Sequence, residues 1–311
     1  MKKIFLVFLL LVSQRSIAQD DVMQRMADSL DYLGKPTHEF TSASFKATRV
    51  INFPTMETMG KNAMDFRIAH RFGEFANGNG NPAYNAFGLD GDACIRLSLD
   101  YGITDWLMVG IGRTSDEKLA DASFKIKMLR QTTDNHIPIS VTLQSAMNYT
   151  FLKDPNNAFT GIDKYRYPVN RISYATCLII GRKINQRLTL ELNEFYIHYN
   201  IVDFASDKND IFATGISGRY KISKRFAVTF EYAYRIGNYT SKKETFHDPL
   251  GIGFDLETGG HVFQFHFTNQ FGMNEVQYIP YTKSDWLKGN IRLGFNISRV
   301  FAIKHKNKST T

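Results

Sequence analysis

The residues best suited to chemistry are charged side chains that recur at every second position inside apolar segments. In 96–101, Arg96 begins an alternation with leucine and tyrosine, and in 226–236 Glu231 and Arg235 alternate with phenylalanine and tyrosine. Because successive side chains of a β-strand point to opposite faces, this spacing gathers the charges on one surface. Rings of arginine and lysine favour anions, so the chemistry expected there is recognition of small anionic solutes.

Extended along the chain, the same alternation places nine bases and four acids on this surface. The bases are Arg67, Arg71, Arg96, Lys125, Lys127, Arg219, Lys221, Arg235 and Arg292. The acids are Asp65, Asp100, Glu191 and Glu231. Two interpretations stay open. The basic surface binds or passes anions, or its charges pair in a solvated network that fills a narrow lumen and carries nothing.

Catalytic residues are not indicated by any motif. His198, His266, Ser140 and Asp100 are residue types that serve as nucleophiles, acids or bases, but they lie far apart and no spacing relates them. We therefore expect no enzyme, and a barrel-wall enzyme of lipase or protease type stays as the last alternative.

Metal and cofactor sites are not expected either. The oxygen-rich loops Asp90–Asp92 and Asp154–Asn157 carry the ligand type that Ca²⁺ prefers, but neither leads to a distal bidentate glutamate. Turn formation explains both loops. Cys94 and Cys177 are too few for a disulfide framework, and we expect them to be small packing residues, with a single disulfide between them as the alternative.

Twelve segments show the alternation of β-strands. They are Met64–Phe72, Cys94–Gly102, Leu107–Thr114, Ala122–Leu129, Ile137–Tyr149, Arg171–Ile184, Leu188–Tyr199, Phe212–Ile222, Phe226–Ile236, Leu250–Leu256, His261–Thr268 and Ile291–Phe301. Their apolar face is aromatic, since the chain has 25 Phe and 15 Tyr, and the opposite face mixes charged residues with small ones. Lipid outside and a crowded polar lumen inside would produce this pattern. A secreted soluble β-protein is the alternative.

The connections between these segments also alternate in length. Short turns are expected at 103–106, 185–187 and 223–225, and long polar connections at 73–92, 152–169, 203–209 and 237–249. Periplasmic turns and longer external loops are typical of outer-membrane barrels. The sequence therefore predicts an all-β, up-and-down antiparallel transmembrane barrel of about 12 strands, within a range of 10–14.

Two segments do not fit the simple pattern. Phe45–Asn52 is a thirteenth strand candidate that would break the even count, so we expect it to pack inside or under the barrel. The alternative is that it is a strand of the wall and that one of the weaker candidates is not. In Leu188–Tyr199 the apolar positions change register after Leu192, and a β-bulge would account for the change.

The N-terminus has the features of a cleavable secretory signal. Lys2 and Lys3 precede an apolar core at 4–12, and small residues at Ser16 and Ala18 favour cleavage before Gln19. Cleavage removes Lys2, Lys3 and Arg15, which leaves a net charge of +8 − 3 = +5. A charge of this size does not indicate nucleic acid as a partner.

The expected domain boundaries follow from these patterns. The signal covers 1–18, a short periplasmic helix at Asp20–Leu33 and an inner or plug segment occupy 19–60, and the barrel covers 61–301. A basic tail, 302–311, follows the last strand.

Several stretches resemble one known family. They are Phe45–Asn52 followed by Asp65–Gly73, the loop Gly88–Asp92 before Arg96, Tyr101–Asp105 and the closing Gly294–Phe301. Together they are similar to an uncharacterised β-barrel family called domain of unknown function 5777, over roughly 45–301. The resemblance implies the outer membrane of a Gram-negative bacterium, but no activity, substrate or catalytic residue.

Three functional hypotheses result. The first is a passive small-solute channel with a mild preference for anions. The second is a structural or partner-docking barrel with a plugged lumen, and the third is the barrel-wall enzyme. All three imply outer-membrane lipid and the barrel-insertion machinery as partners, with no cofactor.

Overall fold

The protein is described here by a computed structural model, which covers residues 38–75, 82–153, 164–202, 206–237, 239–240 and 245–303. The expected signal at 1–18, the helix at Asp20–Leu33, the loop 154–157 and most of the tail 302–311 lie outside the described residues. Everything described from Phe40 onward belongs to one unit.

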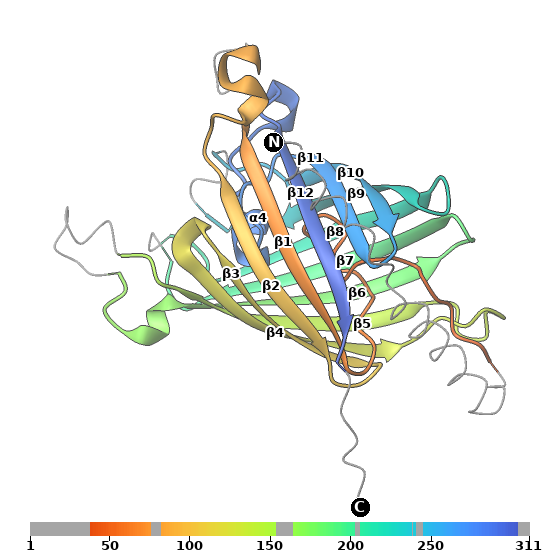
Figure 1. Ribbon diagram of the computed structural model, residues 1–311. Coiled ribbons are helices and arrows are strands. Elements are labelled where there is room, and N and C mark those ends of the chain that lie inside the picture. The colour runs from red at the N-terminus through yellow and green to blue at the C-terminus, as the bar shows by residue number, and fades with distance from the viewer. Residues whose placement is uncertain are drawn as a thin grey trace, which may run out of the picture. The chain divides into compact units, whose positions relative to one another are not determined.

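Twelve antiparallel strands close into a barrel, in which each strand pairs with its neighbours in sequence and β1 pairs with β12 (Figure 1). The strands are β1 (Ala63–Glu74), β2 (Cys94–Gly102), β3 (Leu107–Thr114), β4 (Leu119–Leu129), β5 (Ser140–Thr150), β6 (Ile172–Lys183), β7 (Leu188–Tyr199), β8 (Asp210–Lys221), β9 (Phe226–Ile236), β10 (Leu250–Thr258), β11 (His261–Thr268) and β12 (Arg292–Ala302). The predicted closed antiparallel barrel is confirmed.

The helices in the described part of the chain are short and belong to connections. They are η1 (Pro82–Gly88), η2 (Asp116–Lys118), η3 (Pro168–Arg171), α4 (Glu275–Tyr281) and η5 (Trp286–Lys288). None of the described helices is long and apolar enough to cross a membrane.

The two faces of the wall differ as the alternation requires. Every second residue of β1 is buried, and its inward positions include Asp65, Arg67 and Arg71. Large apolar side chains are exposed on the outward positions, for example Ile111 at 60% and Ile216 at 45%. An apolar outer face of this kind is suited to lipid.

The ends of the barrel differ in the length of their connections. One end of the barrel holds the first residue of β1, and we call it the turn end. There the turns after β2, β6, β8 and β10 have two to four residues, and only the β4–β5 connection is longer. The opposite end carries the long connections after β1, β5, β7, β9 and β11, and we call it the loop end. The predicted asymmetry is therefore present, although the β3–β4 connection at the loop end is short.

The predicted bulge in β7 was wrong. The pairings of β7 with β6 and with β8 run without a shift in register. Instead, the buried face continues from Glu191 and Asn193 to Phe195 and Ile197. The apolar positions change because the side chains of Phe195 and Ile197 pack on chain segments that lie inside the barrel.

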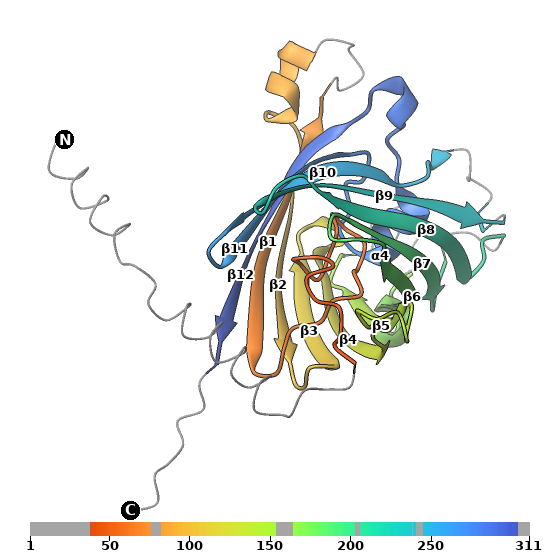
Figure 2. The same cartoon turned by 90° about the vertical axis from the view of Figure 1, so that its right-hand side faces the viewer.

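Two chain segments lie inside the barrel. The inner segment, Ser44–Glu57, precedes β1 in the chain and forms no strand of the wall. Phe45–Asn52 therefore lies inside the barrel (Figure 2). The loop segment, 269–284, belongs to the β11–β12 connection and contains α4. Both segments are largely buried, and Phe53 and Ile279 have no exposed surface.

The outward face can be tested with one charge. Ile216→Arg, in the middle of β8, is expected to lower the free energy of unfolding in lipid vesicles by about 2–4 kcal/mol, because arginine is costly at the membrane midplane. Ile222→Arg, in the β8–β9 turn, is the matched control and should cost about 0–1 kcal/mol. Equal costs in denaturant unfolding would contradict a lipid-facing wall.

Candidate functional site

The inner segment is held first by Glu231, an inward residue of β9. Its carboxylate accepts hydrogen bonds from three consecutive backbone amides, those of Ile51, Asn52 and Phe53, at 2.9–3.1 Å. The amide of Gln270 donates to the same carboxylate at 3.1 Å. Because a buried carboxylate is costly unless several donors compensate it, the bend of the inner segment and Glu231 stabilise each other.

A base holds the same segment from the opposite side. The Lys125 ammonium on β4 donates to the backbone carbonyls of Thr48 and Thr55 at 3.0 Å and of Glu57 at 3.3 Å. Glu191 on β7 accepts the amide of Met56 at 2.7 Å. Irregular backbone inside a barrel needs such partners, because there is little water to satisfy it.

The loop segment is bound to the wall at the loop end. Asn274 donates to Asp121 at 3.0 Å, and Gln277 donates to the carboxylate of Asp116 at 3.1 Å. Burial raises the pKa of the Asp116 carboxyl above its usual value, while the charge of Lys283 acts in the opposite direction.

The two segments meet inside the barrel. The Arg49 guanidinium lies 2.9 Å from the Glu275 carboxylate, and the Asn52 side chain donates to Gln270 at 2.5 Å. The rings of Phe53 and Tyr278 stack with their centroids 5.6 Å apart. Two polar contacts and one aromatic contact therefore join the two segments inside the lumen.

The predicted basic residues occupy inward positions, but most of them already bind acids. Arg67 pairs with Asp65 at 3.0 Å, and Arg96 pairs with Asp121. The other pairs are Lys127–Glu57, Arg219–Asp255, Arg219–Glu257, Arg235–Asp248 and Arg292–Glu74. Arg71 donates to Asn52 at 2.7 Å and to Asn296 at 3.0 Å. Lys221 is half-buried near the turn end.

The predicted acids follow the same pattern. Asp65, Glu191 and Glu231 are buried, and Asp100 accepts a hydrogen bond from Thr48 at 2.9 Å. The inward surface is thus engaged by the two segments and by internal pairs, and the structure does not bring the bases together as one unpaired cluster.

Sequence reasoning missed three inward acids and the whole loop segment. Asp121 was missed because the predicted strand began at the next residue, Ala122. Asp255 and Glu257 lie at the alternate positions of β10 that point inward. The available signal for the loop segment was apolar side chains, such as Val276 and Ile279, inside a long connection.

The four residues considered for catalysis stay apart. His266 is fully buried on the inward face, whereas His198 lies on the outward face and contacts Asp210 at 2.8 Å. Ser140 accepts from the backbone amide of Gln131 near the turn end. Both cysteines are free and buried, and no metal-binding cluster occurs among the described residues.

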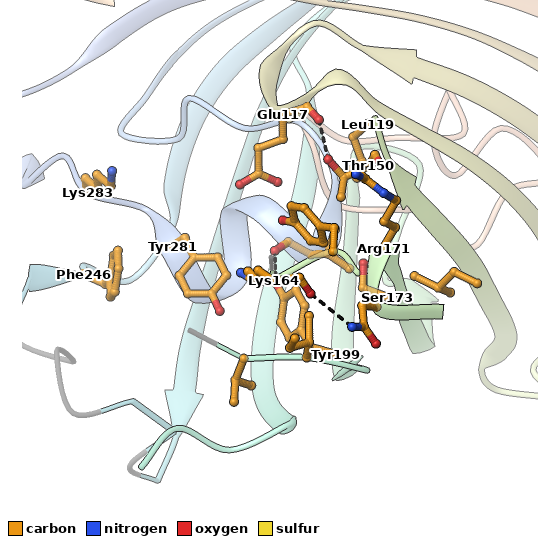
Figure 3. A pocket seen from close by; sticks show the side chains of 16 residues that line it. Glu117, Leu119, Thr150, Lys164, Arg171, Ser173, Tyr199, Phe246, Tyr281 and Lys283 are labelled. Carbon is orange, nitrogen blue, oxygen red and sulfur yellow. Dashed lines mark hydrogen bonds between the residues drawn. The ribbon is translucent and has the colours of Figure 1, made fainter. Parts of the chain in front are cut away.

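A cavity of about 230 Å³ opens at the loop end beside the loop segment (Figure 3). Its bases are Lys164, Arg171 and Lys283, and one acid, Glu117, also lines it. Its aromatic side chains are Tyr165, Tyr199, Phe246 and Tyr281. Concave sites that combine aromatic walls with a few polar groups are typical of small-molecule binding.

Comparison with solved structures gives distant similarities to membrane channels. An outer-membrane channel from Pseudomonas putida F1 is 14% identical and aligns over 79% of this chain and 98% of its own, with a TM-score of 0.46. The KdgM porin is 7% identical over 78% of this chain and 99% of its own, with a TM-score of 0.44. Outer-membrane protein Omp33 from Acinetobacter baumannii is 8% identical over the same shares, with a TM-score of 0.41. No curated protein matches the sequence.

The family comparison is more direct. The model of a membrane-bound β-barrel domain (DUF5777) matches residues 45–301, which include all of the inner segment except Ser44 and all but the last residue of the barrel wall. This confirms the resemblance seen in the sequence. The chain belongs to this family of membrane-bound β-barrel domains.

Proposed function

We propose that the protein is an outer-membrane barrel that is closed at rest and acts through its loop end, by docking a ligand or partner. The observation that carries this proposal is the contact between the inner segment and the loop segment inside the lumen. A barrel filled in this way does not offer a permanent path for solutes.

The fit between the inner segment and the wall supports closure. A methyl group added at Gly215 would lie 2.9 Å from the Phe53 ring, and one added at Gly251 would lie 2.9 Å from Ile51. These distances are shorter than ordinary van der Waals contacts, so only glycine lets the wall approach so closely. Close packing on two strands leaves little room for solutes beside the segment.

The outer membrane of a Gram-negative bacterium is the proposed location. The expected N-terminal signal directs export, and the apolar outer face suits lipid. The difference between turn end and loop end favours loops on the cell exterior, with lipid and the insertion machinery as the partners of biogenesis.

A small-solute channel with a mild anion preference is the second candidate. The nine inward bases favour it, because rings of basic side chains attract anions. Their pairing with inward and loop acids lowers the field that a passing anion would meet, and passage would require displacement of at least one segment.

Conductance separates the two candidates. In planar bilayers, the refolded chain is expected to give no stable open steps at low voltage. The double variant Glu191→Ala with Glu231→Ala removes the two wall carboxylates that accept backbone amides of the inner segment, so it should give open steps. Circular dichroism and heat-modifiable migration on gels would show that each protein is folded.

The opposite result is equally clear. Stable, anion-selective steps from the unmodified protein would overturn the closed barrel and support the channel. In that case Arg96→Glu and Arg219→Glu should each reduce the anion preference that the reversal potential reports.

Hydrogen exchange tests the attachment of the inner segment without any conductance. Glu231→Ala should speed exchange at the amides of Ile51, Asn52 and Phe53 by about 10–100-fold, because hydrogen bonds to a charged group are worth about 1.5–3 kcal/mol. Glu194→Ala is the control, since Glu194 lies on the outward face and accepts from Thr214 at 2.7 Å. Unchanged exchange in the Glu231 variant would contradict the attachment.

A further inference from the structure

The loop-end cavity differs in its lining from the paired charges deeper in the lumen, because aromatic side chains form much of its wall. We infer that it binds a small carboxylate carried on a six-membered ring. This inference deepens the proposed function, since it names the ligand class of the loop end. The cavity shares the loop segment with the filled lumen, but ligand binding is measured separately from conductance.

The charge of the cavity selects an anion. Three bases and one acid line it, and hydrogen bonds hold Arg171 in place. One guanidinium nitrogen of Arg171 donates to the carbonyls of Thr150 and Leu152 at 3.2 and 2.7 Å, and its centre lies 4.6 Å from the Tyr165 ring centroid. A guanidinium has five donors in a planar fork, which matches the two oxygens of a carboxylate.

The aromatic wall selects a ring. Tyr281 lies between Phe246 and Tyr199, with ring centroids 5.3 and 5.7 Å away (Figure 3). The Tyr199 hydroxyl donates to the carbonyl of Val276, which fixes the ring at the edge of the cavity. Flat or ring-shaped ligands pack on such faces, and aromatic rings prefer offset or edge contacts with them.

The size of the cavity limits the ligand. An apolar cavity of about 150 Å³ holds benzene. A volume of about 230 Å³ therefore admits one six-membered ring with its substituents. Both an aromatic acid and an acidic monosaccharide meet this description.

The position of the cavity couples the ligand to the lumen. Val276, Tyr281 and Lys283 come from the β11–β12 connection, whereas Thr150 and Arg171 come from the wall and the adjoining β5–β6 connection. A ligand between them touches both parts and stabilises the position in which the loop segment fills the barrel.

Binding to the full refolded chain tests the inference. The probes are 4-hydroxybenzoate and glucuronate, measured by titration calorimetry, with 4-hydroxybenzamide as the neutral match of the first. At least one acid should bind, and in the aromatic pair the amide should bind about tenfold more weakly, because a charge-assisted contact is lost.

Variants assign the binding to this cavity. Lys283→Gln should weaken binding of the acid that binds by about tenfold and leave the amide unchanged, and Tyr281→Leu should weaken the acid and the amide alike. Lys288→Gln is the matched control, since Lys288 lies on the same connection, is highly exposed and does not line the cavity. Migration of the folded barrel on gels checks each variant.

Comparison of 4-hydroxybenzoate with glucuronate shows whether the ring that carries the carboxylate is aromatic or a sugar. Binding of either acid supports the inference. Failure of both acids to bind the folded protein would overturn it. Equal binding of the amide and the aromatic acid would also overturn it, and so would an acid affinity that Lys283→Gln leaves unchanged. Because binding and conductance are measured in separate experiments, a failure of the ligand class can be told apart from a failure of the closed barrel.

Discussion

The arrangement inside the barrel depends on the carboxylate of Glu231. An ionised side chain that is fully buried needs several donors, and three amides of the inner segment supply them at one bend. The requirement is mutual, because those amides lie in irregular backbone that has no neighbouring strand to accept them. Lys125 does for the carbonyls of the segment what Glu231 does for its amides. The inner segment is thus held by charges on opposite sides of the wall.

Apolar packing completes what the charges begin. Phe53 contacts Phe195 of β7 edge to face at 5.1 Å and stacks on Tyr278 of the loop segment. An inward phenylalanine would be poorly placed in a water-filled pore, but it is well placed against a buried segment. The apolar inward positions of β7 and the two segments inside the barrel therefore have one common cause, which is that the lumen is a core.

The wall could be predicted from the sequence because each strand carries its own signal. Period-two alternation is local, so β2, β3, β7, β9 and β11 were placed to the residue. What could not be predicted depends on distant partners. The change of pattern in 188–199 looks the same in the sequence whether a bulge causes it or whether Phe195 and Ile197 pack on a segment inside the barrel. The contact between Phe53 and Phe195 shows that the second explanation is correct. Likewise, the alternation within its strand shows that Arg96 points inward. Its pairing with Asp121 could not be seen there, because Asp121 lies on β4, two strands away from β2.

The loop segment links the interior of the barrel to the cavity at the loop end. Glu275 contacts Arg49 inside the barrel, and Tyr281 and Lys283 line the cavity only six and eight residues later. A segment this short, with α4 at its centre, cannot leave the lumen and keep its place in the cavity wall. Any ligand that prefers the assembled cavity must therefore also favour the filled lumen, by the difference between its affinities for the two arrangements. On this reasoning the occupant of the cavity acts on the barrel as a stabiliser of its closed form.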